Sequence, residues 1–121
     1  MAATTETVTA TGIPSKHNVL FGSWTTDATK GDHVITTPCH VAFVFAILDS
    51  GGTNPNMLVK FAAESDESYL LDGGPTQALA TSPADSAGIT ITNNADGTST
   101  IDIDSTSQVN SGTNQWFAIT K

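Results

Sequence analysis

The sequence predicts an all-β chain that folds as a single-domain antiparallel β-sandwich or small barrel with an extended N-terminal arm. Three observations support this class. Short segments are rich in β-branched and aromatic residues, turn signals separate them at regular spacing, and helical periodicity of apolar residues is almost absent. A length of 121 residues suits one domain. We therefore expect residues 1–15 to form the arm and residues 16–121 to form the β-sandwich domain.

The strongest local pattern is a β-hairpin over residues 88–104. Its turn, Asn94–Thr98, contains Gly97 where a hairpin turn needs a positive φ. On both sides of the turn, apolar and polar residues alternate, as in strands with one buried face. The alternation predicts a core face made of Ile89, Ile91, Ile101 and Ile103. It predicts a solvent face made of Thr90, Thr92, Asp102 and Asp104.

Six further segments have the β-branched and aromatic content of strands. In chain order they are Thr7–Thr11, Val19–Thr25, His33–Thr37, Val41–Leu48, Met57–Phe61 and Gln115–Thr120. The run Val41–Leu48 is apolar throughout, so we interpret it as a central strand rather than a short buried helix, and expect it to be the most buried element. The irregular segment Glu64–Ser86 is expected to be a long loop with one short strand or turn of helix, of the kind that is usually functional or mobile.

The N-terminal arm ends at Gly12-Ile13-Pro14, where proline fixes its own φ and donates no hydrogen bond. Its short strand, Thr7–Thr11, lies in a polar lead-in to the domain. We expect such an arm to become ordered by pairing with a neighbouring chain. The segment Thr4–Ile13 is therefore a candidate contact with a partner.

Charge and composition narrow the classes of partner. The chain has four lysines, no arginine and twelve carboxylates, for a net charge of -8. Arginine is the preferred residue for holding phosphate and carboxylate groups, and a negative surface repels nucleic acid and anionic membranes. We expect no nucleic-acid and no membrane partner, and contacts that are apolar, hydroxyl-mediated or directed at cationic patches. The N-terminus lacks a signal-peptide pattern, which predicts synthesis in a cytoplasm.

Residues with catalytic or metal-binding chemistry form no recognisable motif. The sequence has no nucleophile elbow, phosphate-binding loop or dinucleotide-binding glycine pattern. The histidines His17, His33 and His40 lack the spacing of zinc ligands, and the single cysteine, Cys39, is interpreted as a small buried apolar residue. We therefore expect a non-enzymatic protein with no cofactor and no metal.

Two groups of residues leave a binding role open. Asp102 and Asp104 share one strand face and, with Asp96, offer carboxylates for a weak Ca²⁺ site, although a solvated strand face is the simpler interpretation. Three aromatic residues suit either a sugar-stacking platform or packing in a core or interface. These are Trp24, Tyr69 and Trp116.

Three short segments carry a resemblance to a known family. They are Phe21-Gly22-Ser23-Trp24, Val34-Ile35-Thr36-Thr37-Pro38 and Trp116-Phe117-Ala118-Ile119. Together with the apolar strand, the Gly/Asn/Pro loop and the hairpin, they resemble small all-β virion structural proteins of tailed bacteriophages, of the capsid decoration (cement) type. The resemblance spans residues Val19 to Thr120 through short motifs, and the segment Glu64–Ser86 departs from the compact pattern expected of the family.

The resemblance implies a decoration protein that binds the outer capsid surface and stabilises the assembled shell. The implied location is the virion. The implied partners are the major capsid protein and further copies of this chain, with a homotrimer at local three-fold positions. No catalytic residue is implied. The expected interface residues are Thr7, Val8, Thr9, Ile13, Trp24 and Trp116. The alternative function is a carbohydrate-binding or adhesion module of a phage tail or capsid surface, built on the aromatic and aspartate groups above.

Overall fold

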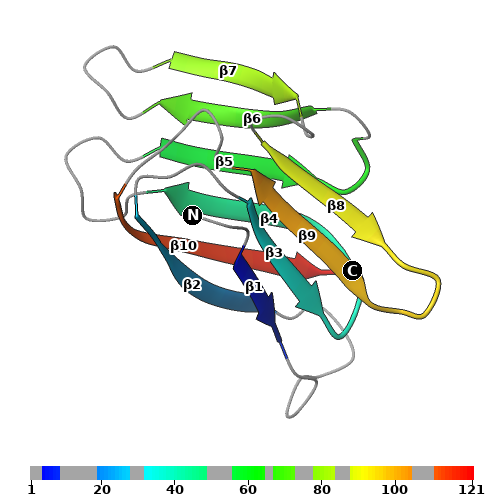
Figure 1. Ribbon diagram of the computed structural model, residues 1–121. Coiled ribbons are helices and arrows are strands. Elements are labelled where there is room, and N and C mark those ends of the chain that lie inside the picture. Colours follow the sequence, from blue (N-terminus) through cyan, green and yellow to red (C-terminus); the bar gives the residue numbers. More distant parts are fainter. Residues whose placement is uncertain are drawn as a thin grey trace.

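The computed structural model of the chain is a two-layer β-sandwich (Figure 1). It describes residues 4–8, 19–27, 32–48, 56–64, 67–72, 78–83, 88–104 and 111–121. The strands in these ranges are β1 Thr4–Thr7, β2 Val19–Asp27, β3 Asp32–Thr37, β4 Val41–Leu48, β5 Asn56–Phe61, β6 Glu67–Asp72, β7 Ala78–Pro83, β8 Ile89–Asn93, β9 Ser99–Asp104 and β10 Ser111–Thr120. These ranges contain no helix, and hence no helical segment of the length and apolarity needed to cross a membrane.

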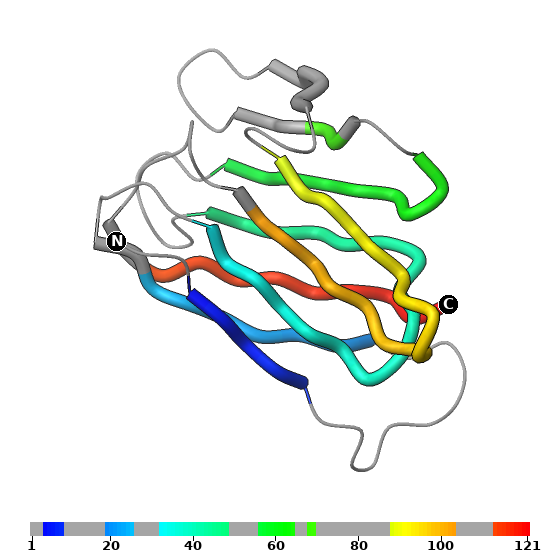
Figure 2. The backbone as a smooth tube through the Cα atoms, turned by 45° about the vertical axis from the view of Figure 1, so that its right-hand side comes forward, coloured from blue at the N-terminus to red at the C-terminus, as the bar shows by residue number. Residues whose placement is uncertain are grey.

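The strands form two sheets. Sheet A has the order β1-β3-β9-β8, and sheet B has the order β2-β10-β4-β5-β6-β7. Each described strand pair is antiparallel except β1 with β3, which is parallel. Sheet A lies across one face of sheet B, with β8 over β4, β5 and β6 (Figures 1 and 2). The predicted sandwich is confirmed, and the described strands do not close into a barrel.

The hydrophobic core fills the space between the sheets. Because side chains alternate across a strand, every second residue points inward. Sheet A contributes Ile35, Ile89, Ile101 and Ile103, and sheet B contributes Leu20, Trp24, Val41, Val44, Ala46, Leu48, Leu58, Trp116 and Ala118. Burial of a large apolar side chain stabilises a fold by about 1.5–3 kcal/mol, so this layer is the main source of stability.

The predicted hairpin is confirmed as β8 and β9. Its register pairs Ile89 with Ile103 and Ile91 with Ile101, and the turn residue Gly97 has φ 91°. Three of the four isoleucines are fully buried, and Ile91 is half-buried against the core. On the opposite face Thr92 is exposed, while Thr90 and Asp102 are half-buried; the side chain of Asp104 lies outside the described part of the chain.

The apolar run Val41–Leu48 forms β4 with the predicted bounds and lies between β10 and β5. The prediction of a central strand is therefore confirmed. Its inward side chains are buried, whereas its outward side chains, Phe43, Phe45 and Ile47, are only half-buried. A strand that is apolar on both faces thus packs against sheet A on one face alone.

The prediction of a long loop over Glu64–Ser86 is wrong for most of its described residues. The segment supplies two strands, β6 and β7, which pair with each other and extend sheet B beyond β5. Clear alternation of apolar and polar residues is missing here. The two strands form because β6 pairs with β5 and β7 pairs with β6. Tertiary pairing commonly overrides weak local preference in strands.

The N-terminal strand also differs from its prediction. The described strand covers Thr4–Thr7 and pairs with β3 of its own chain, whereas pairing with a neighbouring chain was expected; of the predicted strand Thr7–Thr11, Thr9–Thr11 lie outside the described residues. Val8 continues the pairing, because its N–H donates to the Thr36 carbonyl at 2.9 Å. Part of the predicted arm is thereby an edge strand of sheet A.

Candidate interaction surface

The outer face of sheet B is a continuous apolar surface, which we call the aromatic face. It consists of Val19, Phe21, Phe43, Phe45, Ile47, Met57, Val59, Phe61, Phe117 and Ile119, from four adjacent strands. Within the described residues, all four large apolar side chains that are exposed to solvent belong to it, and Phe21 is 78 % exposed. No described segment covers this face (Figures 1 and 2).

Phenylalanine rings organise the centre of the aromatic face. Phe117 on β10 lies 5.1 Å from Phe45 and 6.2 Å from Phe43 between ring centroids, and Phe43 meets Phe61 edge-on at 5.0 Å. Such pairs prefer offset or edge-to-face geometry and stabilise each other by about 0.5–1.5 kcal/mol. The rings therefore hold one another in place and present a preformed surface.

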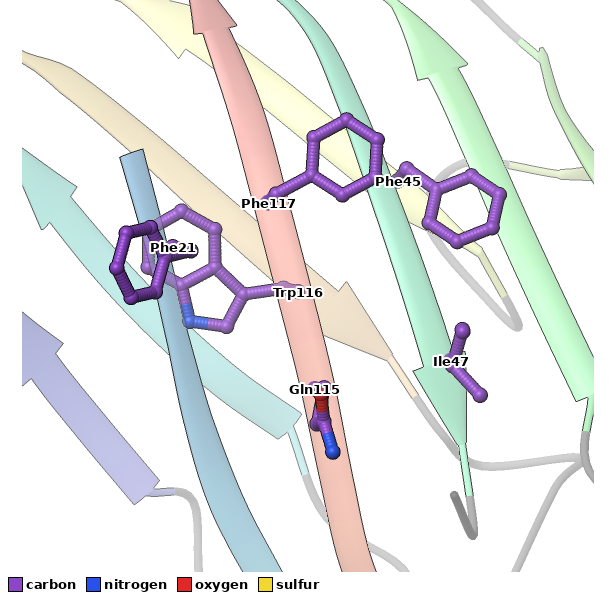
Figure 3. A pocket seen from close by; sticks show the side chains of 6 residues that line it. All are labelled: Phe21, Phe45, Ile47, Gln115, Trp116 and Phe117. Atoms are coloured by element: carbon purple, nitrogen blue, oxygen red, sulfur yellow. The ribbon is translucent and has the colours of Figure 1, made fainter. Parts of the chain in front are cut away.

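A shallow hollow of about 290 Å³ lies on the aromatic face. Its lining comes from β2, β10 and β4, and consists of Phe21, Phe45, Ile47, Gln115, Trp116 and Phe117 (Figure 3). Gln115 contributes a side-chain amide to an otherwise apolar rim. An apolar side chain of a partner fits such a hollow better than a charged group, because the lining offers no ionic counterpart.

The outer face of sheet A has a different chemistry. Its described side chains are mostly threonines, with Thr5, Thr7, Thr36 and Thr92 exposed. The two broad faces of the sandwich are therefore unlike, one hydroxyl-rich and one apolar. Exposed contiguous apolar patches above about 300–600 Å² mark interaction sites, so the aromatic face is the candidate functional surface.

A polar cluster centred on Glu6 fixes β1 to the domain. The Trp116 indole N–H donates to Glu6 Oε2 at 2.7 Å, and His33 Nε2 lies 2.9 Å from the same oxygen. Because a carboxylate only accepts hydrogen bonds, His33 Nε2 carries a proton, and Nδ1 lies 2.6 Å from the Thr4 hydroxyl oxygen, which also lies 3.4 Å from the Asp32 carbonyl oxygen. Trp24 stacks on His33 at 4.3 Å between ring centroids. We call these five residues the Glu6 cluster.

Burial governs the ionisation of His33. The side chain is 2 % exposed, and desolvation lowers the pKa of His33, an effect that the hydrogen bond and charge of Glu6 partly oppose. A lowered pKa favours the neutral ring at pH 7. The Glu6 cluster is thus a buried anchor built around a neutral histidine.

Acidification should weaken the fold through His33. Its pKa is lower in the folded chain than the ordinary 6.5, so the unfolded chain takes up the proton first as pH falls. The free energy of unfolding should therefore decline between pH 7 and pH 5, by at most about 1.4 kcal/mol per pH unit, the limit for one proton. Urea denaturation at a series of pH values measures this slope. It should flatten in His33→Gln and persist in the matched variant His40→Gln; an unchanged slope in His33→Gln would contradict the assignment.

The residues expected at an interface fall into three groups. Thr7 is exposed on the outer face of sheet A, and Val8 is half-buried against the core. Trp24 and Trp116 are 8 % and 2 % exposed, so of the two roles expected for them the structure shows packing in the core of this chain. Thr9 and Ile13 lie outside the described residues.

Among the residues expected to bind sugar or Ca²⁺, those whose side chains the structure describes do not come together. Trp24 and Trp116 are buried, and the Tyr69 hydroxyl donates to both carboxylate oxygens of Glu64, at 2.9 and 3.1 Å, so these three side chains form no shared platform. Asp96 accepts from the Thr98 N–H and hydroxyl, which lowers the pKa of Asp96. Among the described residues no three acidic, histidine or cysteine side chains gather as a metal site.

The remaining reactive groups serve the fold. Cys39 is half-buried against the core, and burial raises the pKa of its thiol, in agreement with the predicted small apolar role. His40 Nε2 donates to the Asn94 carbonyl at 2.7 Å, which ties the segment before β4 to the hairpin turn. His17 lies outside the described residues.

The sequence contained a signal for the aromatic face that local interpretation missed. β4 has apolar residues on both of its faces. The same holds for the segments Val19-Leu20-Phe21 and Trp116-Phe117-Ala118-Ile119. In a two-sheet sandwich only one face of each sheet is covered, so a strand with apolar residues on both faces leaves an apolar outer face.

Comparison of the chain with protein-family models, curated proteins and solved structures found no match.

Proposed function

We propose that this chain is a non-enzymatic structural protein of a tailed-bacteriophage virion, which binds the outer capsid surface as a homo-oligomer and stabilises the assembled shell. The observation that supports the proposal is the aromatic face, an apolar surface of ten side chains on an otherwise polar, acidic molecule. A surface of this kind suits a permanent component of a protein assembly. The resemblance of three segments to virion proteins supports the choice of assembly.

Stabilisation of the shell would need no chemistry. A protein that binds the assembled shell but not its separated subunits shifts the equilibrium towards the shell by mass action. At a free concentration 100 times the dissociation constant, one such site stabilises the assembled state by about 2.7 kcal/mol. Repeated over the many equivalent positions of a shell, this suffices for a cement role. The major capsid protein would be the partner, and its contact would involve the N-terminal segment and the hydroxyl-rich face of sheet A.

Co-sedimentation with empty shells, assembled from the major capsid protein of the same virus, tests the proposal. Saturable binding and a raised melting temperature of the shells are expected. Thr7→Glu places a charge on the exposed face of β1 and should weaken binding about ten-fold, or about 1.4 kcal/mol. The matched variant Ala95→Glu, exposed in the turn between β8 and β9 and outside the face of sheet A, should bind like the parent. Absence of saturable binding by the parent chain would refute the proposal.

A further inference from the structure

We propose that the aromatic face of sheet B is covered by the same face of a second copy of this chain, in a two-fold symmetric dimer. The inference rests on the assembly role proposed for the aromatic face, and it names the partner at that surface. Three features of the described residues support it: the charge of the face, its area and its shape.

Charge favours the aromatic face, rather than another part of the acidic surface, as the contact between two copies. The chain carries a net charge of -8, so two copies repel each other wherever carboxylates meet. The ten side chains of the aromatic face include no charged group, and the described side chains at its margin on β2 and β10 are Ser23, Thr25, Thr113 and Gln115. On the β6 side of the face the Glu64 carboxylate accepts from the Tyr69 hydroxyl, at 2.9 and 3.1 Å. Two copies can therefore meet over the part of the face on β2, β10 and β4 without burying or opposing a charge.

The area matches what a specific dimer needs. With about 200 Å² for a fully exposed large side chain, the exposed fractions of Val19, Phe21, Phe61 and Ile119 correspond to about 400 Å². The six half-buried side chains of the face raise the total to roughly 600 Å² per copy. Specific interfaces bury about 600–1,000 Å² per partner, so the face reaches the lower end of that range without any contribution from other segments.

Shape favours a two-fold arrangement. The face is one side of a β-sheet, and sheets pack face to face about 10 Å apart with side chains interdigitating. In a two-fold contact the same patch serves both copies, so one self-complementary face satisfies the symmetry. The hollow beside Phe21 provides a recess, and the protruding Phe21 ring provides a projection, within the same patch. A trimer would require two different patches on each copy.

Light scattering after size exclusion, at submillimolar concentration, tests the dimer. The expected mass is twice the chain mass of 12.5 kDa. Phe21→Glu and Ile119→Glu change exposed residues of the face and should raise the dimer dissociation constant at least about 100-fold, because each dimer carries the change twice. The matched variant Thr36→Glu adds the same charge on the exposed face of sheet A and should remain dimeric. Circular dichroism and melting temperature check that all variants fold.

A monomeric parent chain, a trimer, or a dimer unaffected by both variants would overturn the proposal. Shell binding of the same proteins separates this inference from the proposed function. A monomer that binds shells and loses binding in Phe21→Glu would assign the face to the capsid protein and overturn the second-copy assignment alone. A face-dependent dimer that ignores shells would support the dimer and refute the decoration role.

Discussion

Replacing Gly22 with valine should lower the free energy of unfolding by about 3–5 kcal/mol. A Cβ atom at this position would lie 2.1 Å from Glu6 Oε1 and 2.7 Å from Trp116 Nε1. The indole is 2 % exposed and has no room to move, and the Glu6 carboxylate can move only by giving up the hydrogen bonds that its Oε2 accepts from Trp116 and His33. The substitution therefore combines overpacking with the loss of buried hydrogen bonds. Urea denaturation followed by tryptophan fluorescence measures the effect.

Ser23→Val is the matched control for this prediction. Ser23 is the next residue of β2, and its side chain is exposed on the opposite face of sheet B. The same isopropyl group there should change stability by no more than about 0.5 kcal/mol. Equal losses in the two variants would mean that a general effect on β2, rather than the close approach to the Glu6 cluster, determines the result.

Glu6→Ala should cost about 3 kcal/mol, because it leaves two buried donors, on Trp116 and His33, without their acceptor. The loss should appear first at β1, whose hold on the domain depends on this carboxylate and on pairing with β3. Hydrogen exchange of the backbone amides of β1 and β3 would show the local opening, and denaturation would give the total. Both readouts are needed because local and global unfolding differ in free energy.

Two further variants serve as controls for Glu6→Ala. Glu6→Gln keeps one acceptor oxygen and should lose less stability than alanine. Thr7→Ala, on the exposed face of the same strand, should stay within about 0.5 kcal/mol of the parent. If Glu6→Ala behaved like Thr7→Ala, the Glu6 cluster would not be the anchor of β1.

Local pattern predicted those parts of the fold in which sequence neighbours are also structural neighbours. The hairpin of β8 and β9 follows from alternation and from Gly97, and the bounds of β4 follow from an uninterrupted apolar run. The strands β6 and β7 were missed because neither shows alternation of apolar and polar residues, although the sequence between them contains the turn signal Gly73-Gly74-Pro75. Within sheet B, β6 pairs with β5 and β7 pairs with β6. Their formation depends on a partner strand rather than on their own composition.

The candidate surface also could not be predicted from local sequence pattern. Phe21, Phe45 and Phe117 come from three strands, and only the order β2-β10-β4 makes them neighbours. Similarly, Glu6 and Trp116 are 110 positions apart, and their contact could not be read from either segment. The interface prediction named Trp24 and Trp116 because tryptophan is common at interfaces. The exposed apolar surface instead consists of phenylalanine and aliphatic residues.

The position of β10 determines when the fold can form. β10 lies between β2 and β4 in sheet B, although it follows them by many residues in the chain. Until residues 111–120 have left the ribosome, the edges of β2 and β4 that face each other lack their hydrogen-bond partner, and β1 lacks the indole that holds Glu6. Contacts of such long sequence separation slow folding. The nascent chain therefore stays incompletely folded until β10 is made, and its apolar strands need protection from other chains during that interval.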